Sequence, residues 1–146
     1  MDRVLVVGGG LAGVEAAWAL ANRGVPVTIA EMKPKKHSPA HKTDMLAELV
    51  CSNSLKAQRV GSAAGLLKAE MERLGSICVE CAKKCSVPAG GALAVDRDEF
   101  SRMITEKIKA HPLVEFECRE VTEIPEGNVI IAAGPLASDA LADKIK

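Results

Sequence analysis

A glycine-rich segment near the amino terminus constrains the fold more than any other part of the sequence. The run Gly8-Gly9-Gly10-Leu11-Ala12-Gly13 follows four apolar residues that have the length of a buried strand. Apolar residues then recur at helical spacing as far as Ala21, and Gly24 stands where a helix would end. A second apolar stretch, residues 25–30, leads directly into Glu31. This succession of strand, glycine turn, helix, strand and acid is the βαβ pattern of dinucleotide binding.

Each residue type in the pattern has a physical reason. Gly8 permits a tight turn after the strand, Gly10 lets the backbone approach a pyrophosphate, and Gly13 lets the helix pack close to the strand. The helix N-terminus offers unpaired N–H groups to phosphates. Glu31 is placed to accept hydrogen bonds from ribose hydroxyls and would repel the extra phosphate of NADP. The pattern therefore favours FAD or NAD, and a merely flexible glycine loop is the weaker alternative.

Composition limits the other possibilities. The 146 residues suffice for one domain with a core, and 19 basic residues balance 19 acidic ones. A net charge of zero argues against strong non-specific attraction to nucleic acid or membrane, although a local patch could still exist. The sequence shows neither a bilayer-spanning apolar run nor a signal peptide, so we expect a cytoplasmic protein. The five cysteines are then expected to be reduced thiols.

Residues 32–44 lack periodicity and are predicted to form a loop. Six basic side chains in this loop could contact phosphates, but a solvated basic loop is favoured on charge alone. These side chains are Lys33, Lys35, Lys36, His37, His41 and Lys42.

Two groups of cysteines are candidates for chemistry. Cys51 follows a predicted helical turn over residues 45–50 and precedes small polar residues, so its thiol could face a ligand; an ordinary buried cysteine is favoured from residue types alone. Cys78, Cys81 and Cys85 could hold zinc or part of an iron–sulfur cluster, with a fourth ligand supplied from elsewhere, from Cys118, His111 or His37. Unligated thiols are the favoured interpretation of this second group.

The remaining elements continue the alternation of helices and strands. A helix marked by Ala63, Leu66, Leu67, Met71 and Leu74 is predicted to end at Gly75. A glycine-rich turn spans residues 87–92, and a further helix begins at Asp96 with a capping-box pattern. Strands are expected over residues 114–118 and 121–124, and a fully buried strand over 129–132. The predicted fold class is α/β, a Rossmann-like FAD/NAD(P)-binding fold with a largely parallel sheet and flanking helices.

The order of motifs along the chain is more specific than the glycine loop. The sequence resembles the N-terminal part of the folate- and FAD-dependent tRNA (uracil-5-)-methyltransferases from about residue 3 to its last residue. The motifs that carry the resemblance are GGGLAGVEAAW at 8–18, EMKP at 31–34, PAH at 39–41, AELVCSNSL at 47–55, GLLK at 65–68, VPAGGALAVDR at 87–97 and GPL at 134–136.

The resemblance implies a flavoenzyme that forms 5-methyluridine in the T loop of tRNA. Methylenetetrahydrofolate would supply the carbon, and NAD(P)H would reduce the flavin that turns a methylene into a methyl group. Residues 8–13 (Gly8, Gly9, Gly10, Leu11, Ala12 and Gly13) and Glu31 would contact FAD, with Gly134 near its adenosine part. Cys51 would be a catalytic thiol beside the flavin, which reverses the interpretation from residue types. The resemblance implies neither a metal nor a membrane partner.

The sequence also departs from the family pattern. Lys33 stands where an arginine is expected and Ala133 where a threonine is expected, and both changes should weaken ligand contacts. Family members continue beyond residue 146, so residues 1–146 would be a partial FAD-binding domain without the substrate domain and the final FAD-binding segment. A shortened, inactive FAD-binding module remains an alternative. A generic flavin or NAD oxidoreductase is disfavoured by the motifs at 47–55 and 87–97.

Overall fold

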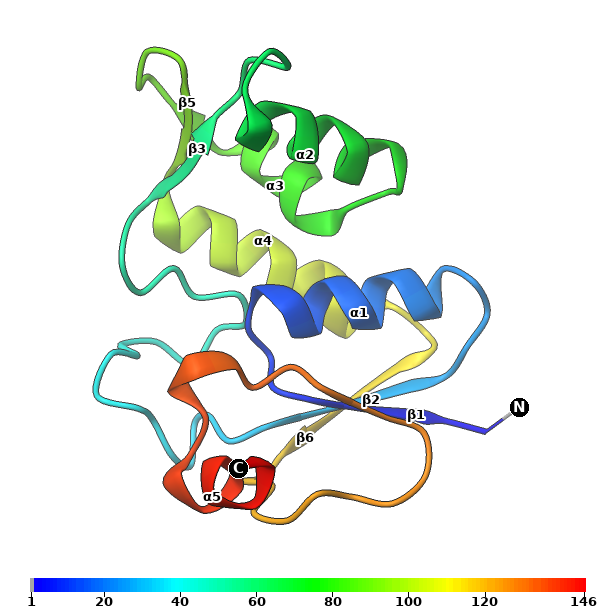
Figure 1. Ribbon diagram of the computed structural model, residues 1–146. Coiled ribbons are helices and arrows are strands. Elements are labelled where there is room, and N and C mark those ends of the chain that lie inside the picture. Colours follow the sequence, from blue (N-terminus) through cyan, green and yellow to red (C-terminus); the bar gives the residue numbers. More distant parts are fainter. Residues whose placement is uncertain (1) are drawn as a thin grey trace.

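The computed structural model describes residues 2–146 and is built around a parallel sheet of four strands (Figure 1). The strands are β1 (Val4–Val7), β2 (Val27–Glu31), β6 (Val114–Cys118) and β7 (Val129–Ile131), in the spatial order β6-β2-β1-β7. β1 pairs in parallel with both β2 and β7. The chain thus reverses its direction of winding between β1 and β7, as in a doubly wound nucleotide-binding half.

Helices cover both faces of this sheet. On one face, α1 (Leu11–Ala21) and α4 (Arg97–Ala110) pack on Val6, Val27 and Ile29 and enclose the main core. On the other face, α5 (Asp139–Ile145) places Leu141 in a smaller cluster with Val7 and Ala30. Figure 1 shows α1 and α5 on opposite sides of the strands. The predicted α/β class, parallel sheet and flanking helices are confirmed.

A second, antiparallel sheet lies in the long connection between β2 and β6, and the sequence did not predict it. It consists of β3 (Ser54–Ala57), β5 (Ala92–Val95) and β4 (Ser86–Val87), in that spatial order. Helices α2 (Ala63–Arg73) and α3 (Ile77–Lys84) pack beside it, at the upper end of the molecule in Figure 1. These strands are short, and the predicted glycine-rich turn lies between β4 and β5, which overlap it only at Val87 and Ala92.

The predicted tight packing of α1 on β1 is present. A β-carbon added at Gly13 would lie 1.8 Å from the Gly8 carbonyl oxygen, so only glycine fits. Gly8 itself has φ +102°, a conformation that L side chains rarely adopt. The glycine turn and the start of α1 therefore form one closely packed unit.

The helical turn predicted over residues 45–50 is wrong. Its backbone groups bond to distant partners instead of to each other: Leu46 N–H donates to Thr105 Oγ1 at 2.9 Å, and Ala47 N–H donates to the Gly9 carbonyl at 2.8 Å. Ala47 also has φ +52°, which a right-handed helix excludes. Tertiary contacts have overridden the local pattern here.

Two strand predictions near the carboxyl terminus also need correction. Residues 121–124 form no strand, because the chain leaves β6 there and crosses beneath the sheet towards β7, with Val121 buried in the cluster under α5. β7 is a strand, but it is not fully buried: Ile130 and Ile131 are 37% and 38% exposed. The cause is the position of β7 at the edge of the sheet.

The two longer predicted helices are present. Asp96 caps α4 by accepting from Glu99 N–H at 3.0 Å, although the Glu99 carboxylate pairs with Arg102 and leaves the capping box half-formed. α2 ends before Gly75, as expected, yet its leucines Leu66 and Leu67 are exposed. Over the described residues, no helix combines the length and apolarity needed to cross a membrane.

Candidate functional site

A cavity of about 310 Å³ opens at the carboxyl ends of the parallel strands. Its walls are the segments that follow the four strands of that sheet, together with parts of the 41–50 segment and of α5. The lining residues are Val7–Ala12, Ala30–Met32, His41, Glu48, Val50, Arg119–Val121, Ala132–Ser138 and Leu141. The cavity therefore lies where β1 and β7 diverge, the place at which open α/β sheets bind ligands.

Glu31 is the acid in this cavity, and it is already engaged by the chain. Its Oε2 accepts from Gly9 N–H at 2.7 Å and its Oε1 accepts from Lys33 N–H at 3.0 Å. The residue is 7% exposed, so these bonds form in a mostly dry environment. A carboxylate has further lone pairs, and it can still accept from a ligand hydroxyl. Glu31 thus fixes the glycine turn to the end of β2 and faces the cavity.

The N-terminus of α1 carries a partial positive charge, opposite in sign to the charge of the Glu31 carboxylate. Gly10 is the N-cap, it offers no side chain to the first turn, and that turn holds no acidic residue. A β-carbon at Gly10 would meet nothing within 4 Å, so the cavity is open at this backbone. The unsatisfied N–H groups and the helix dipole make this wall of the cavity suitable for phosphate.

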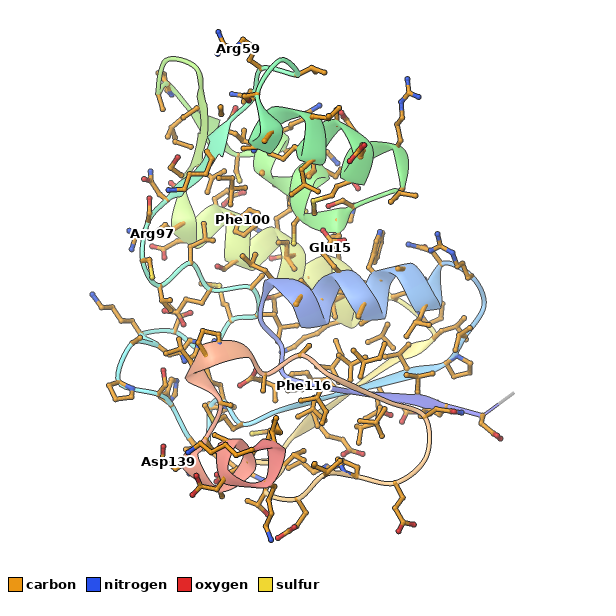
Figure 2. The ribbon with its side chains drawn as sticks, viewed as in Figure 1. Glu15, Arg59, Arg97, Phe100, Phe116 and Asp139 are labelled. Atoms are coloured by element: carbon orange, nitrogen blue, oxygen red, sulfur yellow. The ribbon has the colours of Figure 1, made fainter. Side chains whose placement is uncertain are left out.

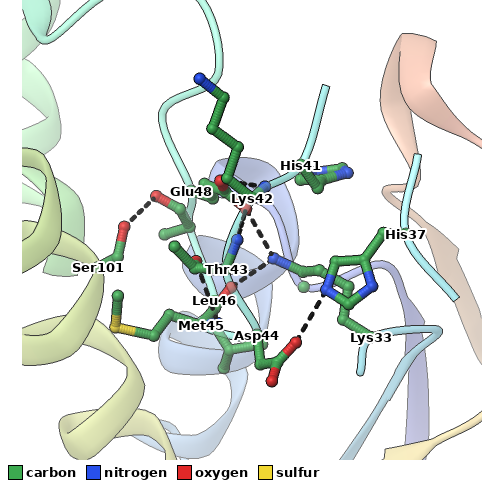
Figure 3. Close-up of polar contacts among 12 residues, drawn as sticks. Lys33, His37, His41, Lys42, Thr43, Asp44, Met45, Leu46, Glu48 and Ser101 are labelled. Atoms are coloured by element: carbon green, nitrogen blue, oxygen red, sulfur yellow. Dashed lines mark hydrogen bonds and ion pairs between the residues drawn. The ribbon is translucent and has the colours of Figure 1, made fainter. Parts of the chain in front are cut away.

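The 41–50 segment forms another wall, and a buried ion pair anchors it (Figure 3). Lys33 Nζ donates to the Met45 carbonyl at 2.5 Å and lies 3.3 Å from Glu48 Oε2, with the two side chains 3% and 10% exposed. Burial alone would raise the pKa of Glu48, but amide donors from Lys42 and Thr43 and the Lys33 ammonium outweigh it and lower that pKa. Lys33 is therefore not solvated, so the interpretation favoured on charge alone is wrong for it, and its ammonium is engaged by Glu48 and the Met45 carbonyl.

The other basic residues of the 32–44 loop behave differently. Lys35, Lys36, His37 and Lys42 are exposed, whereas His41 lines the cavity. The pKa of His41 is lowered, first by partial burial and then by the nearby Lys33 charge. A neutral imidazole is therefore the form that faces the cavity near neutral pH.

The structure brings together most of the predicted site residues. Gly8, Gly9, Gly10, Leu11, Ala12, Glu31 and Gly134 all line the cavity, and Gly13 packs directly behind it. Cys51 does not line it: the residue is exposed and follows Val50, which does. Gly134 has φ +63° and begins a short 3₁₀ helix, η1 (Gly134–Leu136).

Sequence reasoning missed Glu48 and the pair Arg119 and Glu120 as parts of this site. Arg119 and Glu120 directly follow β6, so the rule that ligands bind beyond the carboxyl ends of strands could have located them. No local signal marks Glu48, because its role depends on Lys33, which is 15 positions away.

The three clustered cysteines lie elsewhere. Cys78, Cys81 and Cys85 are buried on or next to the inner face of α3 and belong to the main core. Burial raises the pKa of all three thiols, that of Cys81 to about 11, so they are protonated at neutral pH. Among the residues described, no group of three or more potential metal-binding side chains is found.

Comparison with known proteins gives a family for nearly the whole chain. The model of the family described as "GIDA: Glucose inhibited division protein A" matches residues 3–143. Among curated proteins, the methylenetetrahydrofolate--tRNA-(uracil-5-)-methyltransferase TrmFO of Listeria monocytogenes is 62% identical over 98% of this chain, and that of Enterococcus faecalis 58% over 99%. The chain spans about a third of the length of these relatives, 33% in both cases.

Solved structures agree with this family at the level of the fold. Aquifex aeolicus GidA superposes with a TM-score of 0.67 at 17% identity, covering 86% of this chain and 21% of that one. The p-nitrophenol 4-monooxygenase PnpA of Pseudomonas putida gives 0.53 at 19% identity, covering 87% and 34%. The resemblance inferred from the sequence is confirmed, and the chain belongs to the glucose-inhibited division protein A family.

Proposed function

We propose that this chain is the FAD-binding part of a tRNA methyltransferase that forms 5-methyluridine. The observation that carries the proposal is the cavity at the β1–β7 divergence, where Gly8–Gly10, Glu31 and Gly134 meet. The relatives named above, which are tRNA (uracil-5-)-methyltransferases by name, supply the reaction class. Since the chain spans a third of their length, the whole activity would require the other two thirds.

The residues present fit FAD. The free N–H groups at the start of α1 and the open backbone at Gly10 would hold the pyrophosphate. Glu31 would accept from the ribose hydroxyls of the adenosine part, and Gly134 would lie beside that part. The same buried carboxylate would repel the additional phosphate of NADP, which favours FAD or NAD over NADP at this position.

Cys51 is the proposed thiol close to the flavin. It is exposed and adjoins Val50 in the cavity wall, so a substrate could reach it from outside. A thiolate that adds to a uracil ring makes the ring carbon that receives the methyl group more nucleophilic. Bound FAD, reduced by NAD(P)H, would supply the reducing equivalent that turns the methylene of methylenetetrahydrofolate into a methyl group.

A titration with FAD tests the proposal. Purified protein should bind FAD saturably, as measured by quenching of flavin fluorescence, and should bind NADP at least about tenfold more weakly, which is about 1.4 kcal/mol. Folded protein, verified by circular dichroism, that binds no FAD would contradict the assignment. With all substrates and tRNA added, we expect negligible 5-methyluridine from this chain alone, and turnover at a normal rate would show that the other two thirds are dispensable.

A catalytically inactive FAD-binding module is the second candidate. It shares every feature of the cavity, so FAD binding does not separate it from the first. Addition of the remaining two thirds of a relative as a separate polypeptide does: recovery of 5-methyluridine formation supports the methyltransferase, and its failure with a folded, flavin-loaded complex supports the inactive module.

A further inference from the structure

The charges of this neutral chain are unevenly distributed along the sequence and in space. Residues 49–69, which include β3, contain two lysines and one arginine and no acidic residue. Residues 115–126, which include most of β6, contain five glutamates and one arginine. Figure 1 shows β3 in the upper part of the molecule and β6 in the parallel sheet of the lower half. Four of these glutamates, Glu115, Glu117, Glu120 and Glu123, are paired with cations of the chain, so the contrast that remains is the lack of acidic residues in 49–69.

Four cations lie along the edge of the molecule that includes β3. We call them the basic stripe: Lys42, Arg97, Lys56 and Arg59. All four are exposed, and within residues 2–146 none of them forms an ion pair. This contrasts with Lys36, Lys83, Lys84 and Arg102, which are exposed but paired with glutamates. The stripe consists of charges that have no partner within the fold.

Contacts between neighbouring segments connect the residues of the basic stripe. Lys42 and Arg97 line the same small cavity of about 90 Å³ between the 41–50 segment and the start of α4. Asn53 is joined to Val95 through both its backbone carbonyl and its side-chain amide, so the entry to β3 lies two residues from Arg97. From Asn53, β3 extends along this edge towards Arg59, which lies at the tip of the molecule in Figure 2.

Lys56 is exposed and follows Leu55, which packs against the main core. Its backbone has φ +68° and lies at an irregularity in the pairing of β3 with β5. Arg59 lies just beyond the end of β3, where Gln58 N–H donates to the Gly91 carbonyl and ties the two tips together. β3 itself is Ser54–Ala57, and the chain from Asn53 to Arg59 can span at most roughly 20 Å, the length of several successive phosphates.

We propose that the basic stripe binds the phosphate backbone of the tRNA substrate, an inference that rests on the function proposed above. Unpaired cations spaced along an extended edge can contact successive phosphates of a polyanion. A single small anion would instead require cations that point to one place. Cys51 lies at the Arg97 end of the edge, three residues before β3. A strand held on the stripe would thus pass beside the proposed catalytic thiol. Two acidic side chains, Asp98 and Glu48, line the small cavity with Lys42 and Arg97; Glu48 is paired with Lys33, and the nearby Asp96 is engaged as the cap of α4.

The test compares two double variants of equal net charge. Lys56→Gln/Arg59→Gln removes two cations of the stripe, and Arg23→Gln/Arg73→Gln removes two exposed cations near the far ends of α1 and α2. Binding of an unmodified tRNA transcript is measured by fluorescence anisotropy over a range of salt concentrations. We expect the stripe variant to bind at least about tenfold more weakly at low salt and to lose about 1 to 2 from the slope of log K against log salt, whereas the control changes less than about twofold.

Equal losses in both variants, or no tRNA binding by the wild-type chain, would overturn the stripe. Tighter binding to phosphatidylglycerol vesicles than to tRNA would overturn it as well, because the edge would then be a membrane surface. FAD titration of the same proteins separates this inference from the proposed function: we expect unchanged FAD affinity in both variants. If the chain binds FAD but fails the tRNA comparison, only the proposal of the basic stripe is overturned. If it passes the comparison without binding FAD, only the cofactor assignment is overturned.

Discussion

Two regions of this molecule relate to their sequence in opposite ways. The part of the parallel sheet that borders the cavity, built from residues 4–31 and 129–138, closely follows the elements predicted from the sequence. The 45–95 region contains a helix predicted where none exists and a three-stranded sheet that was not predicted. Most of the first region is one contiguous βαβ unit, whereas residues of the second, such as Leu46 and Ala47, bond to partners outside their own segment.

The contrast has a functional consequence. At the sheet edge, glycines and Glu31 face a cavity, so substitutions there should change ligand affinity. In the 45–95 region, buried polar groups are satisfied within the fold, as Glu48 is by Lys33 from the preceding loop, so substitutions there should change stability first. Substitutions in the two regions therefore test this division.

Glu48→Gln should be the most damaging. It leaves the Lys33 ammonium, which is 3% exposed, without its carboxylate partner, and breaking a buried pair in this way costs about 3–5 kcal/mol of unfolding free energy. Urea unfolding followed by circular dichroism measures the loss. Glu72→Gln, which breaks an exposed pair with Lys83, is the matched control and should cost less than about 1 kcal/mol.

Acid should weaken the same pair. Because the pKa of Glu48 in the folded chain lies below its ordinary value of 4.5, its contribution is present above pH 4.5 and disappears as the pH falls below that value. The difference in stability between the wild type and Glu48→Gln should therefore shrink on acidification. A difference that stays constant from neutral pH to pH 3 or so would exclude the ionised pair as its source.

Gly13→Ala should affect both stability and binding. The added β-carbon would lie 1.8 Å from the Gly8 carbonyl oxygen, which forces α1 away from the glycine turn. We expect a loss of about 1–3 kcal/mol, or more, in unfolding free energy together with loss of FAD binding. Gly24→Ala tests a glycine outside the cavity: it strains a residue at φ +81° but should leave the FAD affinity of the folded protein intact. Equal FAD affinity in the wild type and Gly13→Ala would disprove the tight packing.

Cys81→Ser should reduce stability alone. Cys81 is fully buried, and a serine hydroxyl placed there without a partner costs about 1–3 kcal/mol. Cys51→Ser, at an exposed position, should change stability by no more than about 0.5 kcal/mol. Because burial raises the pKa of Cys81 from 9.0 to about 11, the stability that its neutral thiol contributes is present below pH 9 and declines as the pH rises towards 11.

The same cysteines allow a test for metal. If their thiols are unligated, EDTA should leave the unfolding temperature of the wild type unchanged. A drop of several degrees on chelation, reversed by added zinc, would instead support the metal hypothesis that the spacing of Cys78, Cys81 and Cys85 raises.

Leu67→Gln should have the smallest effect. The leucine is 57% exposed although the sequence places it in an apolar helical pattern, and a surface change of this kind stays within about 0.5 kcal/mol. A loss above 1 kcal/mol or so would mean that the helical pattern does report burial in this region, contrary to the structure.

These differences show what the sequence could reveal. The sequence predicted the structural roles of Gly8, Gly13 and Glu31 because each contacts groups of the same βαβ unit. Leu46 and Ala47 were not, because their amides bond to Thr105 and Gly9 across the fold. Lys33 was misread for the same reason: a basic loop residue looks solvated until the carboxylate that buries it is located. Cys51 stays a prediction, since its exposed position next to the cavity neither requires nor excludes a catalytic role.

The most direct measurement is a side-by-side FAD titration of the wild type and Gly10→Ala. A β-carbon at Gly10 meets no other atom within 4 Å, so the variant should keep the wild-type unfolding free energy to within about 1 kcal/mol. Our account predicts saturable FAD binding by the wild type and an affinity at least about tenfold lower for Gly10→Ala, because the new methyl group occupies the space beside the helix N-terminus. Equal affinities in two folded proteins, or no FAD binding by the wild type, would contradict the assignment of this sheet edge as the cofactor site.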